Sequence, residues 1–245
     1  ADGAVFIAHV RDISERRARE RRLEEQRDDL EILNQVVRHD IRNDVAVIVG
    51  WGDALEEHVD AEGQAYLDRM LSAGEHISNI TDTVGDFLSV LEGDSDPELH
   101  RVDLESVLTN EIEKARSAYD NTTITVTGDL DDGLDVIATD LLSSVFRNLL
   151  NNAVQHHDGD EPTVEVSAEV EDDWVLVQVA DDGPGIDPDR RETVFGKGEK
   201  GLESEGTGLG LYLVQSLVEQ YGGEVWIEDN EPKGAVFVVR LSLCE

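Results

Sequence analysis

Apolar and polar residues recur with the period of an α-helix in the N-terminal part of the chain. One such stretch runs from Ser14 to about Val59 and a second from Ala61 to Leu91, and the short segment HVDAEG separates them. At about 100° per residue, the apolar positions of each stretch share one helical face. We call the set in the first stretch the apolar stripe: Leu23, Leu30, Val37, Ile41, Ile48 and Leu55. Two amphipathic helices with a short connection predict an antiparallel helical hairpin.

This hairpin, which we place at residues 34–93, buries too little apolar surface by itself. Pairing of two hairpins into a four-helix bundle would complete the core, so we expect a homodimer. A break follows at residues 93–97, with the sequence GDSDP, and the pattern then changes.

Beyond the break, helical and strand patterns are mixed. Segments with helical periodicity are 102–119, 140–156 and 208–221, and strand patterns occur at 123–127, 136–137, 163–170, 174–180, 224–227 and 235–243. The third and fourth strands are expected to form an antiparallel pair. Residues 182–205 combine glycine with charge, as in a mobile loop. The expected fold class is α+β, with a dimerising helical hairpin followed by an α/β sandwich at residues 98–245.

Composition limits the cellular setting. The chain is 39% hydrophobic but only 5% aromatic, which predicts an aliphatic core. The single cysteine, Cys244, excludes an internal disulfide and fits a reducing compartment. No apolar run approaches the roughly 18 residues that cross a bilayer, so no membrane insertion is expected within this segment. We expect a cytoplasmic location. Because the chain begins with Ala1, it reads as a piece of a longer protein, whose membrane tethering stays open.

The net charge of −36, from 20 basic and 56 acidic residues, excludes most nucleic-acid binding, because a phosphate backbone would be repelled. The acidic residues are spread along the chain instead of forming one tail, and only four of the basic residues are lysines. This balance favours a halophilic protein, because screening in molar salt removes the self-repulsion.

Four short segments carry the chemistry. A glycine-rich run alone could be a tight turn, but the four occur together and in order: VRHDIRN at 37–43, RNLLNNA at 147–153, DDGPGI at 181–186 and GTGLGL at 206–211. They resemble the H, N, G1 and G2 boxes of sensor histidine kinases, over about residues 30–243. The second part also resembles the superfamily of gyrase-type, chaperone and mismatch-repair ATPases.

His39 is the candidate phosphoacceptor. It lies about 200° around the helix from Val37, so it is expected to face solvent, where a nucleophile can meet a separate ATP-binding domain. Imidazole is nucleophilic only when one ring nitrogen is unprotonated. Asp40 can accept a hydrogen bond from the other nitrogen, and Asn43 lies one turn further on the exposed side. Alone, His39 would read as one of seven histidines on the surface.

Asn148 and Asn152 are four residues apart and share a helical face. An amide oxygen is a hard ligand that suits Mg²⁺. The resemblance assigns magnesium to Asn152 and a place near the phosphates of ATP to Asn148.

Asp181 ends the apolar strand WVLVQVAD, and the resemblance implies that its carboxylate reads the adenine amino group. Gly183 and Gly185 would let the backbone approach the base. Asp182 is one residue away from the family pattern. In the last segment, backbone amides before a helix can meet phosphate oxygens, which implies binding by Gly206, Thr207, Gly208, Leu209 and Gly210.

Some positions depart from the family pattern. Gln155, followed by His156, stands where a phosphate-contacting lysine is common, and Gly198 replaces the second phenylalanine of the lid motif that begins at Val194-Phe195. Asn43-Asp44 replaces the Thr-Pro that often follows the phosphoacceptor. Residues 1–13 resemble the end of a PAS sensor domain, and residues 14–33, rich in arginine, would form a signalling linker helix.

The resemblance therefore implies an autokinase that binds ATP and Mg²⁺, phosphorylates His39 and passes the phosphoryl group to the receiver domain of a response regulator. Two alternatives are an ATP-driven conformational ATPase of the same superfamily and a non-catalytic dimeric scaffold. The exposed histidine argues against the first alternative, and the presence of Asp181 and Asn152 argues against the second.

Overall fold

The computed structural model describes residues 37–52, 54–92, 98–119, 121–128, 133–159, 161–196 and 209–244. The expected PAS end, the whole of the expected linker helix at residues 14–33 and three residues of the last glycine-rich segment, Gly206, Thr207 and Gly208, lie outside the described residues. The chain divides between Thr81 and Asp82 into two compact units.

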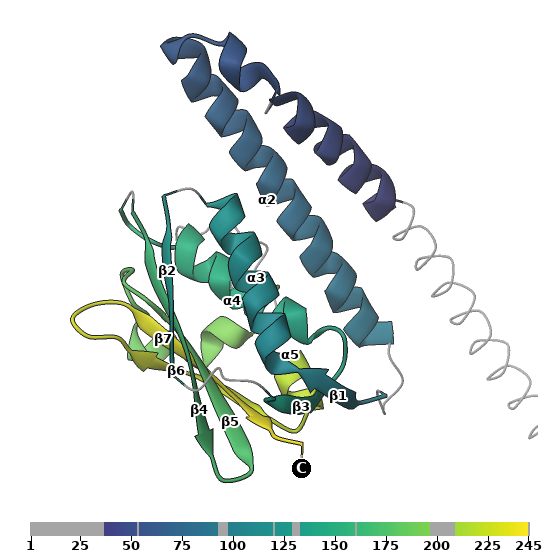
Figure 1. Ribbon diagram of the computed structural model, residues 1–245, viewed down its shortest axis with the longest axis vertical. Helices are drawn as coiled ribbons and strands as arrows, with labels where there is room; N and C mark the ends of the chain where they lie inside the picture. Colours follow the sequence, from purple (N-terminus) through teal and green to yellow (C-terminus); the bar gives the residue numbers. More distant parts are fainter. Residues whose placement is uncertain are drawn as a thin grey trace, which may run out of the picture. The chain divides into compact units, whose positions relative to one another are not determined.

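The first unit is a helical hairpin (Figure 1). Its first helix covers residues 37–52 and 54–55 and is followed by η1 (Glu56–His58) and α2 (Ala61–Glu92), whose last turns belong to the second unit. The side chain of Asp60 accepts a hydrogen bond from the Gly63 amide at 2.9 Å, within the first turn of α2. The expected hairpin and its short connection are confirmed.

The two helices of the hairpin approach closely through glycines. A Cβ atom on Gly52 would lie 2.4 Å from Leu71 Cδ2, and one on Gly74 would lie 3.0 Å from Val49 Cγ2. Val45 and Leu67 are buried. The described members of the apolar stripe are instead exposed, as Ile48 is with 44% of its surface. A single hairpin therefore buries a different row of residues and leaves the stripe uncovered.

The second unit is an α/β sandwich built on a five-stranded sheet in the order β2-β4-β5-β7-β6. β2 and β4 are parallel, and the other neighbours are antiparallel. A separate antiparallel pair joins β1 and β3. The strands are β1 (His100–Asp103), β2 (Thr123–Gly128), β3 (Asp135–Ala138), β4 (Thr163–Glu171), β5 (Trp174–Asp181), β6 (Glu224–Asp229) and β7 (Ala235–Ser242).

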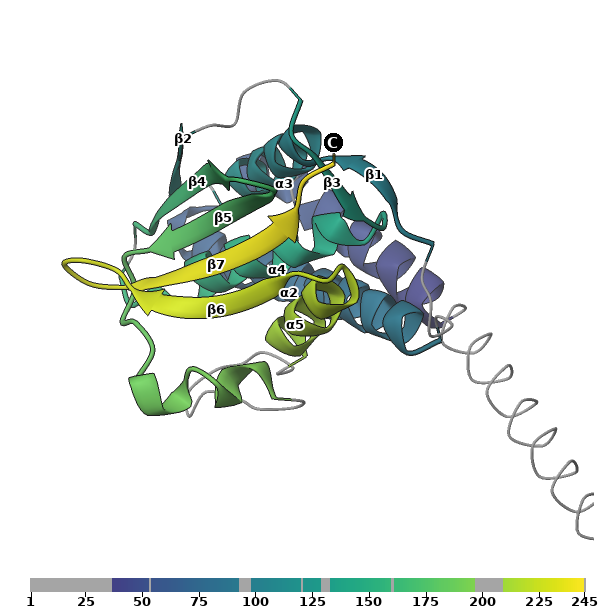
Figure 2. The ribbon, with the colours of Figure 1, turned by 90° about the horizontal axis from the view of Figure 1, so that it is seen from below.

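Three helices cover one face of this sheet (Figure 2). They are α3 (Leu104–Ala118), α4 (Leu142–Gln155) and α5 (Gly210–Gln220), and two short 3-10 helices, η2 (Pro188–Arg190) and η3 (Thr193–Phe195), follow β5. Strand residues alternate between the two faces, so every second residue of β5 (Val175, Val177 and Val179) is fully buried beneath the helices.

Local sequence explains where these helices begin and end. Asp103 caps α3 by accepting the Ser106 amide at 3.0 Å. α5 ends at Gly222, whose φ of +73° suits glycine, and the next amide, of Gly223, donates to the Val218 carbonyl at 2.9 Å. The structure thus confirms the sandwich and the antiparallel pair of β4 and β5.

Candidate nucleotide-binding and phosphoacceptor sites

The core anchors α4, which carries both candidate asparagines. Leu149, Leu150 and Ala153 are buried and hold the helix against the sheet. Asn148 is also buried, and its side-chain nitrogen donates to the Ser144 carbonyl at 2.7 Å. A Cβ atom on Gly210 would lie 2.7 Å from Asn148 Oδ1, so glycine is what lets the start of α5 pack against this amide.

Asn152 lies one turn after Asn148 and is half-buried. Within the described part of the chain, its side-chain amide makes no hydrogen bond, so its oxygen is available to a hard cation. The described residues hold no group of three or more His, Cys, Asp or Glu side chains that could bind a metal. The amide oxygen of Asn152 is a hard ligand of the kind that Mg²⁺ accepts.

Asp181 closes β5 with its side chain buried. Its Oδ1 accepts the Gly183 amide at 2.9 Å and the Ala235 amide at 3.2 Å. Burial raises the pKa of this carboxyl group, and the two amide donors oppose the shift. No described residue donates to Oδ2, which leaves this oxygen to accept a proton from a ligand amino group.

The glycines after Asp181 make room for its carboxylate. A Cβ atom on Gly183 would lie 2.9 Å from Asp181 Oδ1. Gly185 has a φ of +75°, which glycine tolerates best, and a Cβ atom there would lie 3.0 Å from the Gly234 carbonyl oxygen. Gly183 thus makes room for the carboxylate of Asp181, and Gly185 lets its segment pass close to Gly234, reasons that the sequence alone did not suggest.

Asp182 has different hydrogen-bond partners from Asp181. Its Oδ1 accepts the Thr163 amide at 2.9 Å and lies 3.2 Å from His157 Nε2. His157 Nδ1 in turn accepts the Gly159 amide at 2.9 Å. Asp182 therefore links the segment between α4 and β4 to the end of β5 through its Oδ1.

Gln155 and His156 stand at the positions where the sequence departs from the family pattern, and neither side chain supplies a cation. The Gln155 amide donates to the Tyr119 hydroxyl at 3.2 Å. Desolvation lowers the pKa of the His156 imidazole; the nearby charge of Asp181 opposes this shift, and part of the residue is exposed. The ring is therefore neutral at pH 7, beside the carboxylate of Asp181.

The lid motif begins in a well-packed position. Phe195 in η3 is buried, and Val194 packs against the same core. Arg191 forms an ion pair with Asp229, and its Nε donates to the Ile186 carbonyl at 3.4 Å. Gly198 lies outside the described residues.

The candidate phosphoacceptor belongs to the hairpin. His39 is exposed over 72% of its side chain, and its Nδ1 lies 3.2 Å from Asp40 Oδ1. The Asn43 side-chain nitrogen lies 3.3 Å from both ring nitrogens. A proton on Nδ1 held by Asp40 would leave the lone pair on Nε2. The expected exposure of His39 is confirmed.

Sequence reasoning missed the contacts between the end of α2 and α4. Asp86 forms an ion pair with Arg147 and accepts the Ser144 hydroxyl at 2.7 Å. The Thr83 hydroxyl donates to Asn148 Oδ1 at 3.5 Å. The sequence shows only that Asp86 and Arg147 carry opposite charges. Many other pairs of residues in the chain do so too, and so this contact could not be predicted.

Two family models match this chain. Residues 29–93 match the His Kinase A (phospho-acceptor) domain, and residues 137–245 match the histidine kinase-, DNA gyrase B-, and HSP90-like ATPase. The sensor histidine kinase ZraS of Salmonella typhimurium is 31% identical over 208 residues, which are 84% of this chain and 44% of ZraS. The chain thus spans less than half the length of that relative.

Solved structures share the fold. Full-length ShkA in complex with AMPPNP has a TM-score of 0.59 at 24% identity, over 86% of this chain and 46% of ShkA. ThkA in complex with the response regulator TrrA has a TM-score of 0.56 at 21% identity, over 89% of this chain and 64% of that chain. With His39 in the first matched domain and Asp181 in the second, the chain carries the phospho-acceptor and ATPase domains of a protein histidine kinase.

Proposed function

We propose that the chain uses ATP to phosphorylate its own His39 and then passes the phosphoryl group to an aspartate of a response regulator. The observation that carries the proposal is the exposed His39 imidazole, with Nδ1 held by Asp40, in a chain that also bears an ATPase domain. A conformational ATPase does not require an exposed histidine as phosphoacceptor, and a non-catalytic scaffold does not require the carboxylate of Asp181 for nucleotide binding.

The nucleotide would be held by residues of three segments. Asp181 would accept the adenine amino proton, Asn152 would bind Mg²⁺, and Asn148 would lie near the phosphates. The backbone amides at the start of α5 and before it would contact phosphate oxygens: Gly206, Thr207, Gly208, Leu209 and Gly210. ATP, when bound, supplies the γ-phosphoryl group, whose charge Mg²⁺ neutralises.

The residues around His39 would divide the chemistry. The lone pair of Nε2 would attack the γ-phosphorus of ATP, the bond from that phosphorus to the β,γ-bridging oxygen would break, and ADP would leave. Asp40 would hold the proton on Nδ1 and stabilise the positive charge that develops on the ring. Asn43, whose side-chain nitrogen lies 3.3 Å from the His39 ring nitrogens, would orient a water molecule toward the phosphorylated aspartate of the partner.

Partners and setting follow from the same proposal. ThkA binds the response regulator TrrA in its solved complex, which supports a receiver domain as the partner here. The exposed apolar stripe supports a homodimer. The described helices include none that is long and apolar enough to span a bilayer. We place the reaction in the cytoplasm, where ATP is available, and in a halophilic source because of the net charge of −36.

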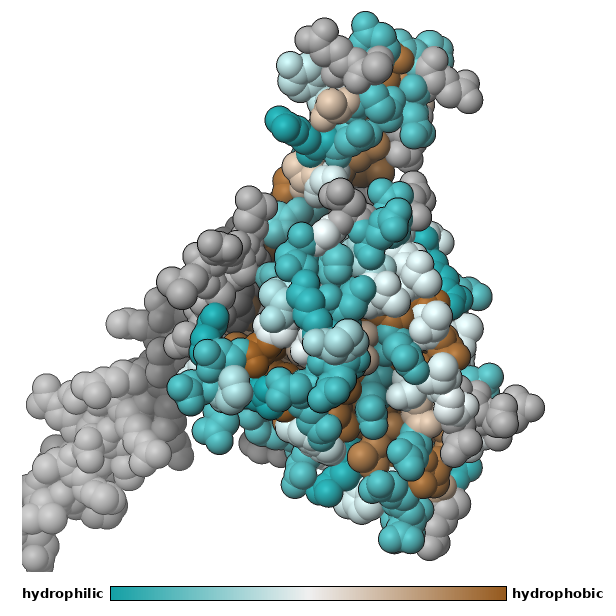
Figure 3. Space-filling model, turned by 90° about the vertical axis from the view of Figure 1, so that its left-hand side faces the viewer, coloured by the Kyte–Doolittle hydropathy of each residue, from teal (hydrophilic) through white to brown (hydrophobic). Residues whose placement is uncertain are grey.

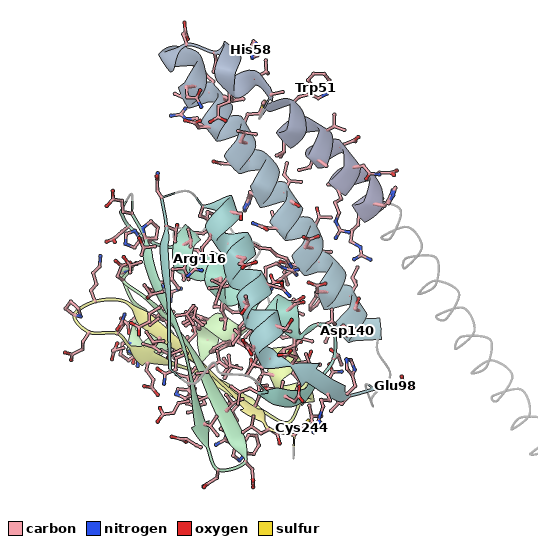
Figure 4. All side chains as sticks on the ribbon, in the orientation of Figure 1. Trp51, His58, Glu98, Arg116, Asp140 and Cys244 are labelled. Carbon is pink, nitrogen blue, oxygen red and sulfur yellow. The ribbon has the colours of Figure 1, made fainter. Side chains whose placement is uncertain are left out.

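Incubation with radiolabelled ATP and Mg²⁺ tests the proposal. The wild-type chain should acquire acid-labile label, and His39→Gln should acquire none while its affinity for ATP stays unchanged. His58→Gln is the matched control, because His58 is also an exposed histidine of the hairpin (Figure 4). Acid-labile label on the His39→Gln variant would refute the assignment of His39.

A further inference from the structure

Asp181 lies where β5 loses β7, its neighbour on one side, while its pairing with β4 continues to Asp181. The pairing of β5 with β7 ends at Ala180 and Val236. Beyond that pair, the side-chain amide of Asn230 donates to the main-chain carbonyl of Asp181 at 2.8 Å. A side chain from the turn between β6 and β7 thus continues the hydrogen bonding that the sheet no longer provides.

The turn fits tightly against Asp181. Gly234 has a φ of +120°, and a Cβ atom there would lie 1.8 Å from the Asp181 carbonyl oxygen, so only glycine permits this approach. The main-chain amide of Asn230 donates to the Gly234 carbonyl at 3.2 Å and closes the turn. The next residue, Ala235, then directs its amide at the Asp181 carboxylate.

Asp181 is therefore held at both ends by one short segment. Ala235 and Gly183 hold Oδ1 of the carboxylate, and Asn230 holds the main chain. These contacts leave Oδ2 as the oxygen that can face a ligand. A shift of the main chain would move Oδ2 directly, because only two rotatable bonds separate the carboxylate from the backbone.

The turn and the end of β6 also make two ion pairs, neither of which contacts Asp181 as Asn230 does. Lys233 Nζ lies 2.7 and 2.9 Å from the two carboxylate oxygens of Asp158, and Asp229 pairs with Arg191. Lys233 and Asp158 are each about half exposed, at 48% and 54% of the side chain, and exposed pairs contribute little. Asn230 is half-buried and touches Asp181 itself.

We propose that Asn230 is a positioning residue for base recognition, an inference that rests on the proposed binding of ATP. Its amide fixes the main chain of Asp181 so that Oδ2 meets the 6-amino group of adenine. Guanine has a carbonyl oxygen at that position, which the carboxylate repels. Because the contact to the amino group distinguishes the two bases, loss of Asn230 should weaken ATP more than GTP.

Calorimetric titration of the 245-residue chain with ATP and with GTP tests the inference. We expect Asn230→Ala to weaken ATP about 5-fold, the loss of one hydrogen bond, and to leave GTP within about 2-fold. Asn230→Asp keeps the shape but sets a carboxylate against a carbonyl oxygen, so its loss should be larger. KM for ATP should rise while kcat at saturating ATP is retained. Lys233→Met, in the same turn, is the control and should bind both nucleotides as the wild type does.

The variant Asp181→Ala distinguishes a failure of the adenine assignment of Asp181 from a failure of the inference about Asn230. Unchanged ATP binding in Asp181→Ala would refute the adenine assignment within the proposed function. If Asp181→Ala loses the preference for ATP but Asn230→Ala keeps the wild-type ratio of ATP to GTP affinity, the inference about Asn230 alone is overturned. An equal loss of both nucleotides in Asn230→Ala, together with a lower Tm, would also overturn it, because that is the result of a structural defect.

Discussion

The two units of the molecule treat their hydrophobic residues differently. The second unit encloses a shared core between its sheet and helices, in which Leu149 and Val177 have no exposed surface. In the described residues, nine of the twelve exposed large hydrophobic side chains belong to the hairpin instead. Figure 3 shows hydrophobic residues in brown, interrupting a mostly hydrophilic surface, and Trp51 projects from the hairpin in Figure 4.

This difference indicates that one unit completes its fold within a single chain and the other does not. Single exposed hydrophobic residues are normal on protein surfaces, but a row of them along a helix marks a contact surface. Four such residues belong to the predicted apolar stripe: Val37, Ile41, Ile48 and Leu55. The comparison can be tested by changing one residue at a time in each unit.

The largest effect is expected in the closed core. Leu149→Ala should lower the free energy of unfolding of the second unit by about 2–5 kcal/mol, the usual loss when a buried leucine leaves a cavity. ATP affinity should fall with it, since α4 also carries Asn148 and Asn152. Denaturant titration measures the change. A loss below about 1 kcal/mol would show that the site collapses around the missing atoms.

A charge on the apolar stripe should act on association. Ile48→Asp should raise the dissociation constant of the homodimer at least tenfold, because a carboxylate buried between apolar helices has no partner. Sedimentation equilibrium measures this constant. Ser72→Asp, at an exposed polar position of α2, is the control. An Ile48→Asp chain that dimerises as the wild type does would exclude the stripe as the interface, and its ATP affinity should be unchanged in either case.

Salt should stabilise both units. Near 1 M salt the Debye length falls to about 3 Å, so repulsion among the acidic side chains and between them and anionic ATP is screened. We expect Tm and autophosphorylation to rise with KCl into the molar range. Seven of the sixteen arginines lie between Arg11 and Arg27, so the ATPase domain keeps most of its negative charge uncompensated. Full activity and an unchanged Tm in 50 mM KCl would contradict the halophilic assignment.

Local patterns were sufficient for most secondary structure. β4 and β5 were predicted nearly to the residue because alternation along a strand is visible in the sequence, and the end of α5 was predicted to within one residue. Periodicity also identified residues that share a helical face. It could not say what covers that face, and so the row around Val45, which packs within the hairpin, was not distinguished from the apolar stripe.

Contacts between distant segments could not be predicted. Asn230 and Asp181 are 49 residues apart, and their hydrogen bond depends on where β7 leaves β5. The separate roles of Asp181 and Asp182 were predicted only from a motif. The different partners of the two carboxylates, which for Asp182 Oδ1 are Thr163 and His157, required the tertiary structure.

The smallest effect that we predict concerns stability at the adenine site. Burial raises the pKa of Asp181 in the folded chain above its value in the unfolded chain. The protonated carboxyl group therefore contributes stability that is fully present below the unfolded-state pKa and is lost as pH rises through the folded-state pKa. At pH 7 the ionised carboxylate therefore destabilises the second unit. Asp181→Asn keeps an oxygen for Gly183 and Ala235 but carries no charge.

We therefore expect Asp181→Asn to have a slightly higher Tm than the wild type at pH 7 and no such advantage at a pH below the usual pKa of aspartate. The same variant should lose its preference for ATP, because its amide group directs a donor at the adenine amino group. Thermal unfolding as a function of pH measures the first effect. A lower Tm at pH 7 would mean that the two amide hydrogen bonds outweigh the burial of the charge. A higher Tm at pH 7 would show that the charged, buried carboxylate of Asp181 lowers the stability of the folded chain.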